Sequence, residues 1–448
     1  MEAALDVMGS PTGSNEDLVL MNDALIKQGE ALQDVGRIFG QTVGRDGAES
    51  TAVSPLLVQV MEHCKVASLG SLHFLAAQAE VLLPRDRPAF IEVTMAFLEH
   101  CDWRQVSVAP KYVGDVCQTF SQVCMAEGRA AQALLPLRTA AYNMGAGTSS
   151  LTPVHPEFLQ CCIVARCYSL AARFLNNQPI FGVDPKATGL TPVHFLRHFY
   201  YGGVVYIGAK QWKQALDCFL MLLTVPANVL SSLVVEGYKK MTLVSLIVSG
   251  NVPTLPKYAS NAVTRQLKSH VSEYEALGTH CQAGDVEGLN AAVLAGSSTF
   301  NQDNNMGLVK QVVGALVKRK IMQLTHTYIT LSLKDISTKV GLEDPEGGEG
   351  YILKMAEAGE ICAKIASPAG TVHFQEGTHT LSSATMTTRL EADLNSTAEL
   401  TERVRSLEAR LMTNPVLIQK MIGDHSVPGG SLGGASGFSA WDDIGMGD

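Results

Sequence analysis

The sequence predicts a mainly α-helical chain: a right-handed α-solenoid of tetratricopeptide-like repeats, then a winged-helix module, then a long C-terminal helix. Three observations predict this fold. Residues 55–290 carry one helical pattern after another, with almost no alternating strand pattern between them. Residues 328–374 carry a different pattern, in which short strand patterns lie around two helical ones. Residues 386–421 carry one long amphipathic helical pattern.

Length and composition limit the classes of protein to which the chain can belong. At 448 residues it is too long for one compact core, which favours several domains or an elongated array of repeats. With 46% hydrophobic and 17% charged residues it is expected to fold, and its low charge suggests that much of its surface is covered, either by the chain itself or by partners. A net charge of −9 does not favour a phosphate backbone as the partner.

The N-terminal part begins with residues 1–17, which are acidic, rich in Gly and Ser, and expected to be disordered. They lack the basic start and the apolar run of a signal peptide. Residues 18–39 have apolar side chains at helical spacing, and residues 42–52 form a Gly-rich linker. The most apolar stretch, residues 243–248, is too short to span a membrane. The expected location is therefore the cytoplasm and the nucleus.

Residues 55–290 are predicted to form paired helices with short connections, the arrangement of an α-solenoid. We assign residues 18–190 to N-terminal helical repeats, and the repeats of a second module continue from residue 191 to about residue 300. Two helix starts are well marked, because Thr191 precedes Pro192 and His155 precedes Pro156. Each proline is expected at the first helical position, where its missing N–H costs nothing.

One repeat fits the tetratricopeptide pattern of a small residue, an aromatic residue, an alanine and a second aromatic residue. Gly203, Tyr206, Ala215 and Phe219 stand at that spacing. Small residues at a crossing let two helices approach closely, so these four residues are predicted to pack the helices of one repeat together. Residues 126–133 resemble the turn and second helix of another, weaker repeat.

Residues 319–376 have the order of elements of a winged helix, preceded by a helix over residues 307–327. A short β-branched run over residues 328–331 is followed by Ser332 and Asp335, which predict a capping box for a helix over residues 333–340. Residues 341–350 are predicted as an acidic connection, and residues 351–358 as a helix that ends at Gly359. A hairpin follows, with strands over residues 361–366 and 371–374.

Residues 377–422 are predicted to form a C-terminal bundle helix, broken once at Asn414 and Pro415, and residues 423–448 a disordered Gly-rich tail. The apolar side chains of the helix recur on one face, and its flanks are mostly polar. A face of this kind needs a partner surface. It is formed by Met386, Leu390, Leu394, Leu400, Val404, Leu407 and Leu411.

The cysteines and histidines give no metal-site signature. None of the 10 cysteines belongs to a C-x-x-C pair, so we interpret them as buried apolar residues in a reducing compartment. His194 and His198 lie four residues apart on a helix and could hold a metal. No acidic residue lies between them and aromatic residues surround them, which favours packed or surface-paired side chains. No metal site is expected.

The sequence carries none of the common motifs of catalysis. The sequence contains no phosphate-binding loop, no nucleophile elbow and no zinc-protease motif, so we predict neither an enzyme nor a cofactor site. The winged helix raises a nucleic-acid hypothesis, but the candidate recognition helix over residues 346–360 carries four glutamates against Lys354 alone. We interpret a small basic cluster as a solvated face or a partner contact; it consists of Lys310, Lys318, Arg319 and Lys320.

This order of elements resembles the PCI module, which occurs in subunits of the proteasome lid, the signalosome and a translation initiation factor. Five short stretches are similar to the family of third subunits of the COP-9 signalosome. The resemblance is firmest over residues 190–374 and places a PCI module at residues 191–376. The stretches are residues 199–203 (FYYGG), 238–240 (YKK), 255–258 (LPKY), 303–311 (DNNMGLVKQ) and 331–336 (LSLKDI).

The resemblance implies a non-catalytic scaffold subunit of a complex that removes a ubiquitin-like modifier from cullins and so regulates cullin-RING ubiquitin ligases. The implied partners are other PCI subunits and the isopeptidase subunit, with cullin-RING ligases reached indirectly. No small-molecule substrate, membrane or nucleic acid is implied. A PCI subunit of the proteasome lid or of an initiation factor complex is the alternative, followed by a winged-helix nucleic-acid-binding protein.

Two interfaces follow from the resemblance. Winged-helix edge strands of neighbouring PCI subunits add to one another's sheets, and here either hairpin strand could supply the edge. The interface residues would be Ile361, Ala363, Ile365, Val372 and Phe374. The C-terminal helices of the subunits gather into a bundle, to which this chain would contribute Leu390, Leu394, Leu400, Val404, Leu407 and Leu411.

Overall fold

The computed structural model confirms a mainly α-helical chain with one small sheet. It describes residues 15–27, 67–82, 87–145, 150–180, 182–227, 229–256, 259–267, 270–342, 345–366, 370–375 and 383–413, with residues 415, 418 and 419. The chain divides into two compact units, Met1–Leu316 (unit 1) and Val317–Asp448 (unit 2). The boundary between the units lies inside the helix Met306–Thr327.

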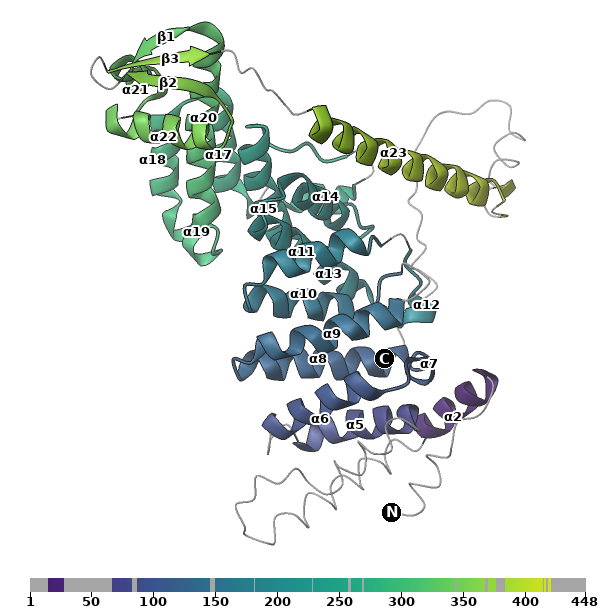
Figure 1. The fold of residues 1–448 in the computed structure, drawn as a ribbon. Helices are drawn as coiled ribbons and strands as arrows, with labels where there is room; N and C mark the ends of the chain where they lie inside the picture. The colour runs from purple at the N-terminus through teal and green to yellow at the C-terminus, as the bar shows by residue number, and fades with distance from the viewer. Residues whose placement is uncertain are drawn as a thin grey trace, which may run out of the picture. The chain divides into compact units, whose positions relative to one another are not determined.

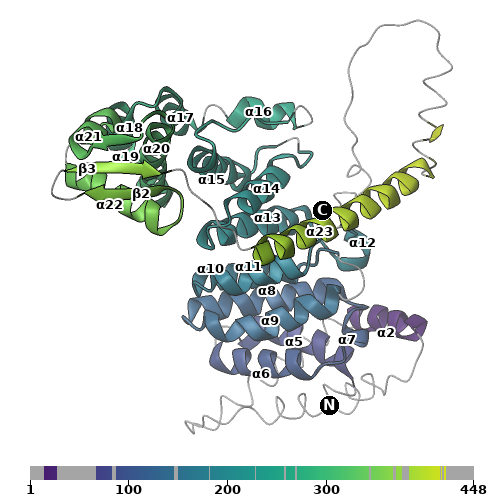
Figure 2. The same ribbon diagram turned by 45° about the horizontal axis from the view of Figure 1, so that its top comes forward.

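Unit 1 is built from helices packed in succession (Figure 1; Figure 2). Along the chain α8 contacts α10, α10 contacts α13, α13 contacts α15, and α15 contacts α17. The helices α9 and α14 pack against members of this row. The described helices are α2 (Asn15–Lys27), α5 (Ser68–Leu82), α6 (Arg87–His100), α7 (Trp103–Val106), α8 (Pro110–Ala126), α9 (Ala130–Gly145), α10 (Val154–Val164), α11 (Tyr168–Asn177), α12 (Pro185–Thr188), α13 (Pro192–Gly208), α14 (Trp212–Leu223), α15 (Ser232–Val248), α16 (Asn261–Leu267), α17 (Ser272–Ala283), α18 (Val286–Ala295), α19 (Ser297–Gln302) and the start of α20 (Met306–Thr327).

The same turn joins the helices of five pairs in unit 1. In each turn one residue has a positive φ, and the amide of the following residue donates to the carbonyl five residues earlier, as Arg129 does to Cys124. This is the Schellman ending of a helix. It reverses the chain in a fixed way and so gives the array its regularity. The residues with positive φ are Gly128, Arg166, Lys210, Gly284 and Asn304.

Unit 2 contains a three-stranded antiparallel sheet of order β1-β3-β2, with two short helices. Ser332 Oγ accepts from the Asp335 amide at the start of α21, and Gly341 ends that helix in the left-handed conformation. Figure 2 shows β2 and β3 side by side, with α22 next to β2. The elements after α20 are β1 (Thr330–Ser332), α21 (Leu333–Val340), α22 (Pro345–Glu357), β2 (Cys362–Ala366), β3 (Thr371–Gln375) and α23 (Ser383–Met412).

Several predicted boundaries were wrong. The first helix begins at Asn15, inside the segment predicted to be disordered, and the remainder of the predicted helix lies outside the described residues. The predicted connection over residues 341–350 contains the start of α22, because Pro345 is suited to a first helical position. Pro156 is the third residue of α10, not the first. The first strand covers Thr330–Ser332, two residues later than predicted.

The C-terminal helix covers Ser383–Met412, and most of its predicted continuation to residue 421 lies outside the described residues. The same is true of the linker over residues 42–52 and of the tail. Of the nine cysteines in the described part of the chain, six are buried, in agreement with the interpretation as small apolar residues. Cys167 and Cys218 are half-buried, and Cys362 is exposed because it lies on the outer strand β2.

Candidate interaction surfaces

The four repeat residues lie at the crossing of α13 and α14. A Cβ atom added to Gly203 would lie 2.5 Å from Cε1 of Phe219, so the two helices are as close as a glycine allows. Ala215 and Phe219 are fully buried beside it. Tyr206 is buried too, and its hydroxyl donates to Oδ1 of Asn176 at 2.9 Å.

The two histidines of α13 have separate structural roles. His194 Nδ1 accepts from the Thr191 amide at 3.3 Å and so caps the helix. The ring of His198 is buried, with its centroid 5.8 Å from that of His155. Burial lowers the pKa of His198 well below its usual value, and lowers that of His155 to about 4. Across the described residues, no three His, Cys, Asp or Glu side chains are grouped as a metal site requires.

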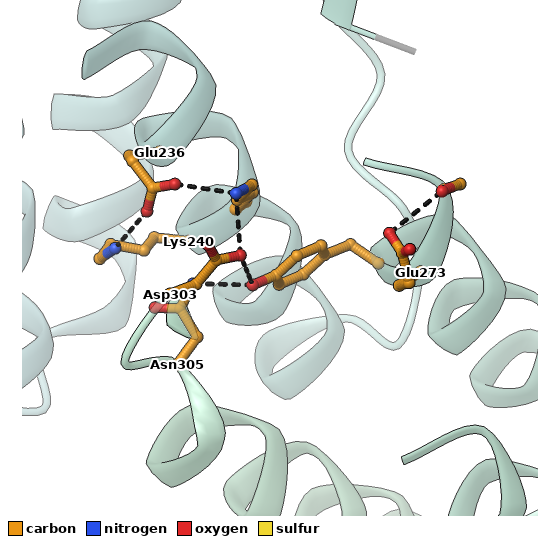
Figure 3. Close-up of polar contacts among 8 residues, drawn as sticks. Glu236, Lys240, Glu273, Asp303 and Asn305 are labelled. Atoms are coloured by element: carbon orange, nitrogen blue, oxygen red, sulfur yellow. Dashed lines mark hydrogen bonds and ion pairs between the residues drawn. The ribbon is translucent and has the colours of Figure 1, made fainter. Parts of the chain in front are cut away.

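A polar cluster joins three parts of unit 1 that are far apart in sequence (Figure 3). Lys239 of α15 donates to Asp303 Oδ2 at 2.8 Å, and the hydroxyl of Tyr274 on α17 donates to the same oxygen at 2.7 Å. Asn305 Nδ2 donates to the Tyr274 hydroxyl at 2.9 Å. The turn before α20 is therefore tied to two other helices.

Glu236 extends the polar cluster along α15. Its two carboxylate oxygens accept from Lys239 at 2.9 Å and from Lys240 at 3.2 Å. The ammonium of Lys240 also lies 5.5 Å from the centre of the Tyr200 ring, a cation–π distance. We use the name polar cluster for Glu236, Lys239, Lys240, Tyr274, Asp303 and Asn305.

The charges of the polar cluster stabilise one another. Burial raises the pKa of Asp303, but hydrogen bonds from Lys239 and Tyr274 outweigh it, so this pKa lies below its usual value. Burial likewise lowers the pKa of Lys239, and hydrogen bonds to Asp303 and Glu236 more than offset that effect. Both groups are therefore ionised at neutral pH, as an intramolecular ion pair.

A pocket of about 390 Å³ opens beside the polar cluster. Its residues come from α10, α13, α15 and the end of α19, all within unit 1. It brings together three of the stretches that carry the family resemblance, those around Tyr200, Lys240 and Asp303. Sequence analysis singled out these stretches without assigning them to one site, because their convergence depends on how the repeats stack.

Among the described strands, β2 lies at one edge of the sheet and is paired on one side only, with β3. The Phe374 amide donates to the Ile329 carbonyl at 2.8 Å, so Phe374 points its backbone groups toward the β1 side. Neighbouring residues in a strand point them to opposite sides, so His373 faces β2, where it pairs with Lys364. It follows that Ala363 and Ile365 direct their N–H and C=O groups away from the sheet.

The prediction that residues 371–374 could supply the free edge was wrong. β3 is the central strand, with β1 on one side and β2 on the other. Val372 and Phe374 are buried and cannot form a partner contact without unfolding the sheet. Ile361 is also buried and precedes β2, whereas Ala363 and Ile365 are half-buried within the edge strand.

The apolar stripe of α23 is open to solvent in the isolated chain. Its six leucine and valine side chains are between 53% and 68% exposed, which is unusual for a row of large apolar residues on one helix face. By helical periodicity they share one side of α23. They are Leu390, Leu394, Leu400, Val404, Leu407 and Leu411.

Comparison with known proteins gives matches to both parts of this architecture. Residues 50–263 match the N-terminal helical repeats of COP9 signalosome complex subunit 3, and residues 293–376 match the PCI domain. The chain is 30% identical to COP9 signalosome complex subunit 3 of Arabidopsis thaliana, over 94% of this chain and 93% of that protein. The chain belongs to the COP9 signalosome complex subunit 3 family. The protein of the same name from Dictyostelium discoideum is 30% identical over 79% of this chain and 84% of its own length.

The family assignment accounts for the order of the elements. The match to the subunit 3 repeats starts at residue 50 and runs from before α5 into α16, and the match to the PCI domain runs from the end of α18 to the end of β3. This assignment favours the signalosome family over the lid and initiation-factor alternatives. Among the described helices, none combines the length and the apolar character that crossing a membrane requires.

A buried ion pair in the repeats was not predicted. Arg197 of α13 lies 2.7 Å from Glu157 of α10, whose other oxygen accepts from Ser121 Oγ at 2.7 Å. Arg197 also donates to Gln160 at 2.8 Å. The sequence signal was Glu157 itself, a charged residue inside an apolar helix, which requires a partner when buried.

Proposed function

We propose that the chain is a non-catalytic scaffold subunit of the COP-9 signalosome, where it supports removal of the ubiquitin-like modifier from cullins and so regulates cullin-RING ubiquitin ligases. The observation that carries this proposal is the match, over 94% of the chain, to a protein named COP9 signalosome complex subunit 3. A scaffold role needs surfaces for partners, and unit 2 offers two of different chemistry.

The first surface is the free edge of β2, which suits strand addition by the winged helix of a neighbouring PCI subunit. An open edge presents N–H and C=O groups that a second strand can pair, giving affinity through the main chain. In this chain Ala363 and Ile365 present those groups.

The second surface is the stripe of α23, which suits a bundle of C-terminal helices from the subunits. Covering a large apolar side chain contributes about 1.5–3 kcal/mol, so six exposed ones provide a strong drive for association. The proposed partners are other PCI subunits and the isopeptidase subunit, with cullin-RING ligases reached through the complex. We place the chain in the cytoplasm and the nucleus, which imaging of a fluorescent fusion would test.

The deciding experiment is affinity purification of the tagged full-length chain from its native cells, with mass spectrometry of the copurifying proteins. We expect a stoichiometric set of PCI subunits with one zinc isopeptidase and cullins. Depleting the chain should then raise the fraction of cullin that carries the modifier. Recovery of proteasome ATPases or ribosomal proteins would contradict the proposal, as would depletion that leaves cullin modification unchanged.

A further inference from the structure

The pocket beside the polar cluster is separate from both assembly surfaces of unit 2, because every residue that lines it belongs to unit 1. One wall is apolar and aromatic, formed by Ile163, Tyr200, Tyr201 and Val204. The rest of the lining is mostly polar. It includes Glu236, Lys240, Asp303 and Asn304.

The charges around the pocket are already neutralised within the chain. Lys240 is paired with Glu236, and Asp303 is paired with Lys239. Arg197, which lies 5.8 Å from the centre of the Tyr201 ring, is paired with buried Glu157. An ionic ligand would have to compete with one of these pairs, so the electrostatics favour an uncharged ligand.

Uncharged hydrogen-bonding groups remain open in the pocket. Among the described residues, no hydrogen-bond partner is found for the hydroxyls of Tyr200 and Tyr201 or for the side-chain amide of Asn304. Hydroxyls and amides both donate and accept, which matches the N–H and C=O groups of a peptide main chain. Exposed tyrosine and asparagine side chains are typical of surfaces that bind protein segments.

We propose that this pocket binds an uncharged, extended segment of another signalosome subunit, which inserts one apolar side chain against Val204 and Ile163. Its peptide groups bond to the Tyr200 and Tyr201 hydroxyls and the Asn304 amide. A volume of about 390 Å³ holds one large side chain with its adjoining main chain. The inference rests on the proposed function, since the complex supplies the partner.

The test uses fluorescent, overlapping short peptides that cover the other subunits of the complex, together with a peptide of residues 423–448 of this chain. Each is titrated with the full-length chain while fluorescence anisotropy is measured. We expect binding by at least one uncharged peptide that contains a large apolar residue. Val204→Glu, which puts a charge on the apolar wall, should weaken that binding by about tenfold or more.

Two controls separate binding from folding. Val193→Glu places the same charge on the same helix at a position that is 56% exposed, and should bind like the wild type. Tyr201→Phe combined with Asn304→Gly removes two groups that no described residue uses and keeps the positive φ of residue 304 possible, so this variant should fold normally and still bind about tenfold more weakly.

Three results would overturn the inference: no peptide binds a chain that still copurifies with its complex, only charged peptides bind, or the Tyr201→Phe, Asn304→Gly variant binds like the wild type. Preferred binding of the peptide of residues 423–448 would also overturn it, because the occupant would then be the chain itself. In the first case the proposed function stands and only the pocket assignment fails.

Discussion

Gly203 leaves no space for a side chain where α13 crosses α14. Its added Cβ would lie 2.5 Å from the Phe219 ring, whereas an added Cβ on the adjacent Gly202 meets Cys218 Sγ at an ordinary 3.5 Å. We expect Gly203→Ala to lower the free energy of unfolding by about 1–3 kcal/mol through overpacking. Gly202→Ala should be neutral or stabilising by up to about 1 kcal/mol. Urea denaturation followed by circular dichroism measures the free energy of unfolding of both variants. An equal loss of stability in the two would contradict the assigned crossing of α13 and α14.

The positive-φ turns allow a stabilising change. Lys210 adopts φ 58° and Arg166 does the same, although a left-handed conformation costs a non-glycine residue about 1–2 kcal/mol. We expect Lys210→Gly to raise the free energy of unfolding by about 0.5–1 kcal/mol, since glycine loses part of the gain through its more flexible unfolded state. Gly128→Ala should lower it by about 1 kcal/mol at the equivalent turn. Thermal melts check both variants. A higher melting temperature for Lys210→Gly and a lower one for Gly128→Ala would support the shared turn, whereas a lower melting temperature for Lys210→Gly would contradict it.

The buried histidines predict how stability depends on pH. Burial lowers the pKa of His155 to about 4 and that of His198 well below its usual value of 6.5. The unfolded chain therefore binds protons that the folded chain does not, and stability falls as the pH drops from about 6.5 toward 4. For each such histidine the loss approaches about 1.4 kcal/mol per pH unit.

Denaturation midpoints between pH 7 and pH 5 check this pH dependence. His155→Asn retains an acceptor for Thr152, whose hydroxyl lies 2.7 Å from His155 Nδ1, and removes the titrating ring. The variant should show a shallower fall in stability over that range. A slope equal to that of the wild type would mean that other groups govern the effect.

At the scale of elements, the sequence predicted what local chemistry decides. Ser332 and Asp335 marked the start of α21, and Gly203 and Phe219 marked a helix crossing, because caps and close crossings restrict residue type. The five Schellman turns were not predicted, because three of them have Arg, Lys or Asn at the position where a Gly would indicate the end of a helix. The central place of β3 and the pocket could not be predicted, since strand order and the stacking of repeats depend on contacts remote in sequence.

The free edge of β2 can be tested with proline. Ala363 directs its N–H away from the sheet, so Ala363→Pro should leave the internal pairing intact and remove one group needed for strand addition. We expect unit 2 to stay folded and incorporation into the complex to fall. Lys364→Pro is the matched control, because its N–H faces His373 and its loss should unfold the sheet. Copurification and a thermal melt distinguish the two variants. Normal incorporation of Ala363→Pro into the complex would mean that the edge of β2 is not an interface.

At the scale of the whole molecule, the chain combines a well-packed array of repeats with a helix whose apolar face is uncovered. Unit 1 fully buries several large aromatic side chains, among them Phe120, Phe158 and Phe219. On α23, Leu400 and Leu407 are 57% and 54% exposed. The stability of unit 1 should therefore be its own, whereas the ordering of α23 should depend on partners and on their concentration.

Leu400→Asp combined with Leu407→Asp tests this separation. Each leucine contributes about 1.5–3 kcal/mol when its side chain is covered, so the double change should remove the chain from the complex. Circular dichroism of the isolated chain should be unchanged, because neither side chain is buried in it. The measurement is the yield of the other subunits on the tagged variant relative to the wild type.

Asn395→Asp combined with Ala409→Asp is the control for added charge. By helical periodicity both positions lie on the side of α23 away from the stripe, and both are exposed. This variant should assemble like the wild type, which would show that the stripe matters and not the charge of the helix. If both double variants assemble normally, α23 is not part of a bundle. If both fail to assemble, the complex tolerates added charge on neither side of α23, which would mean that partners cover the whole circumference of the helix.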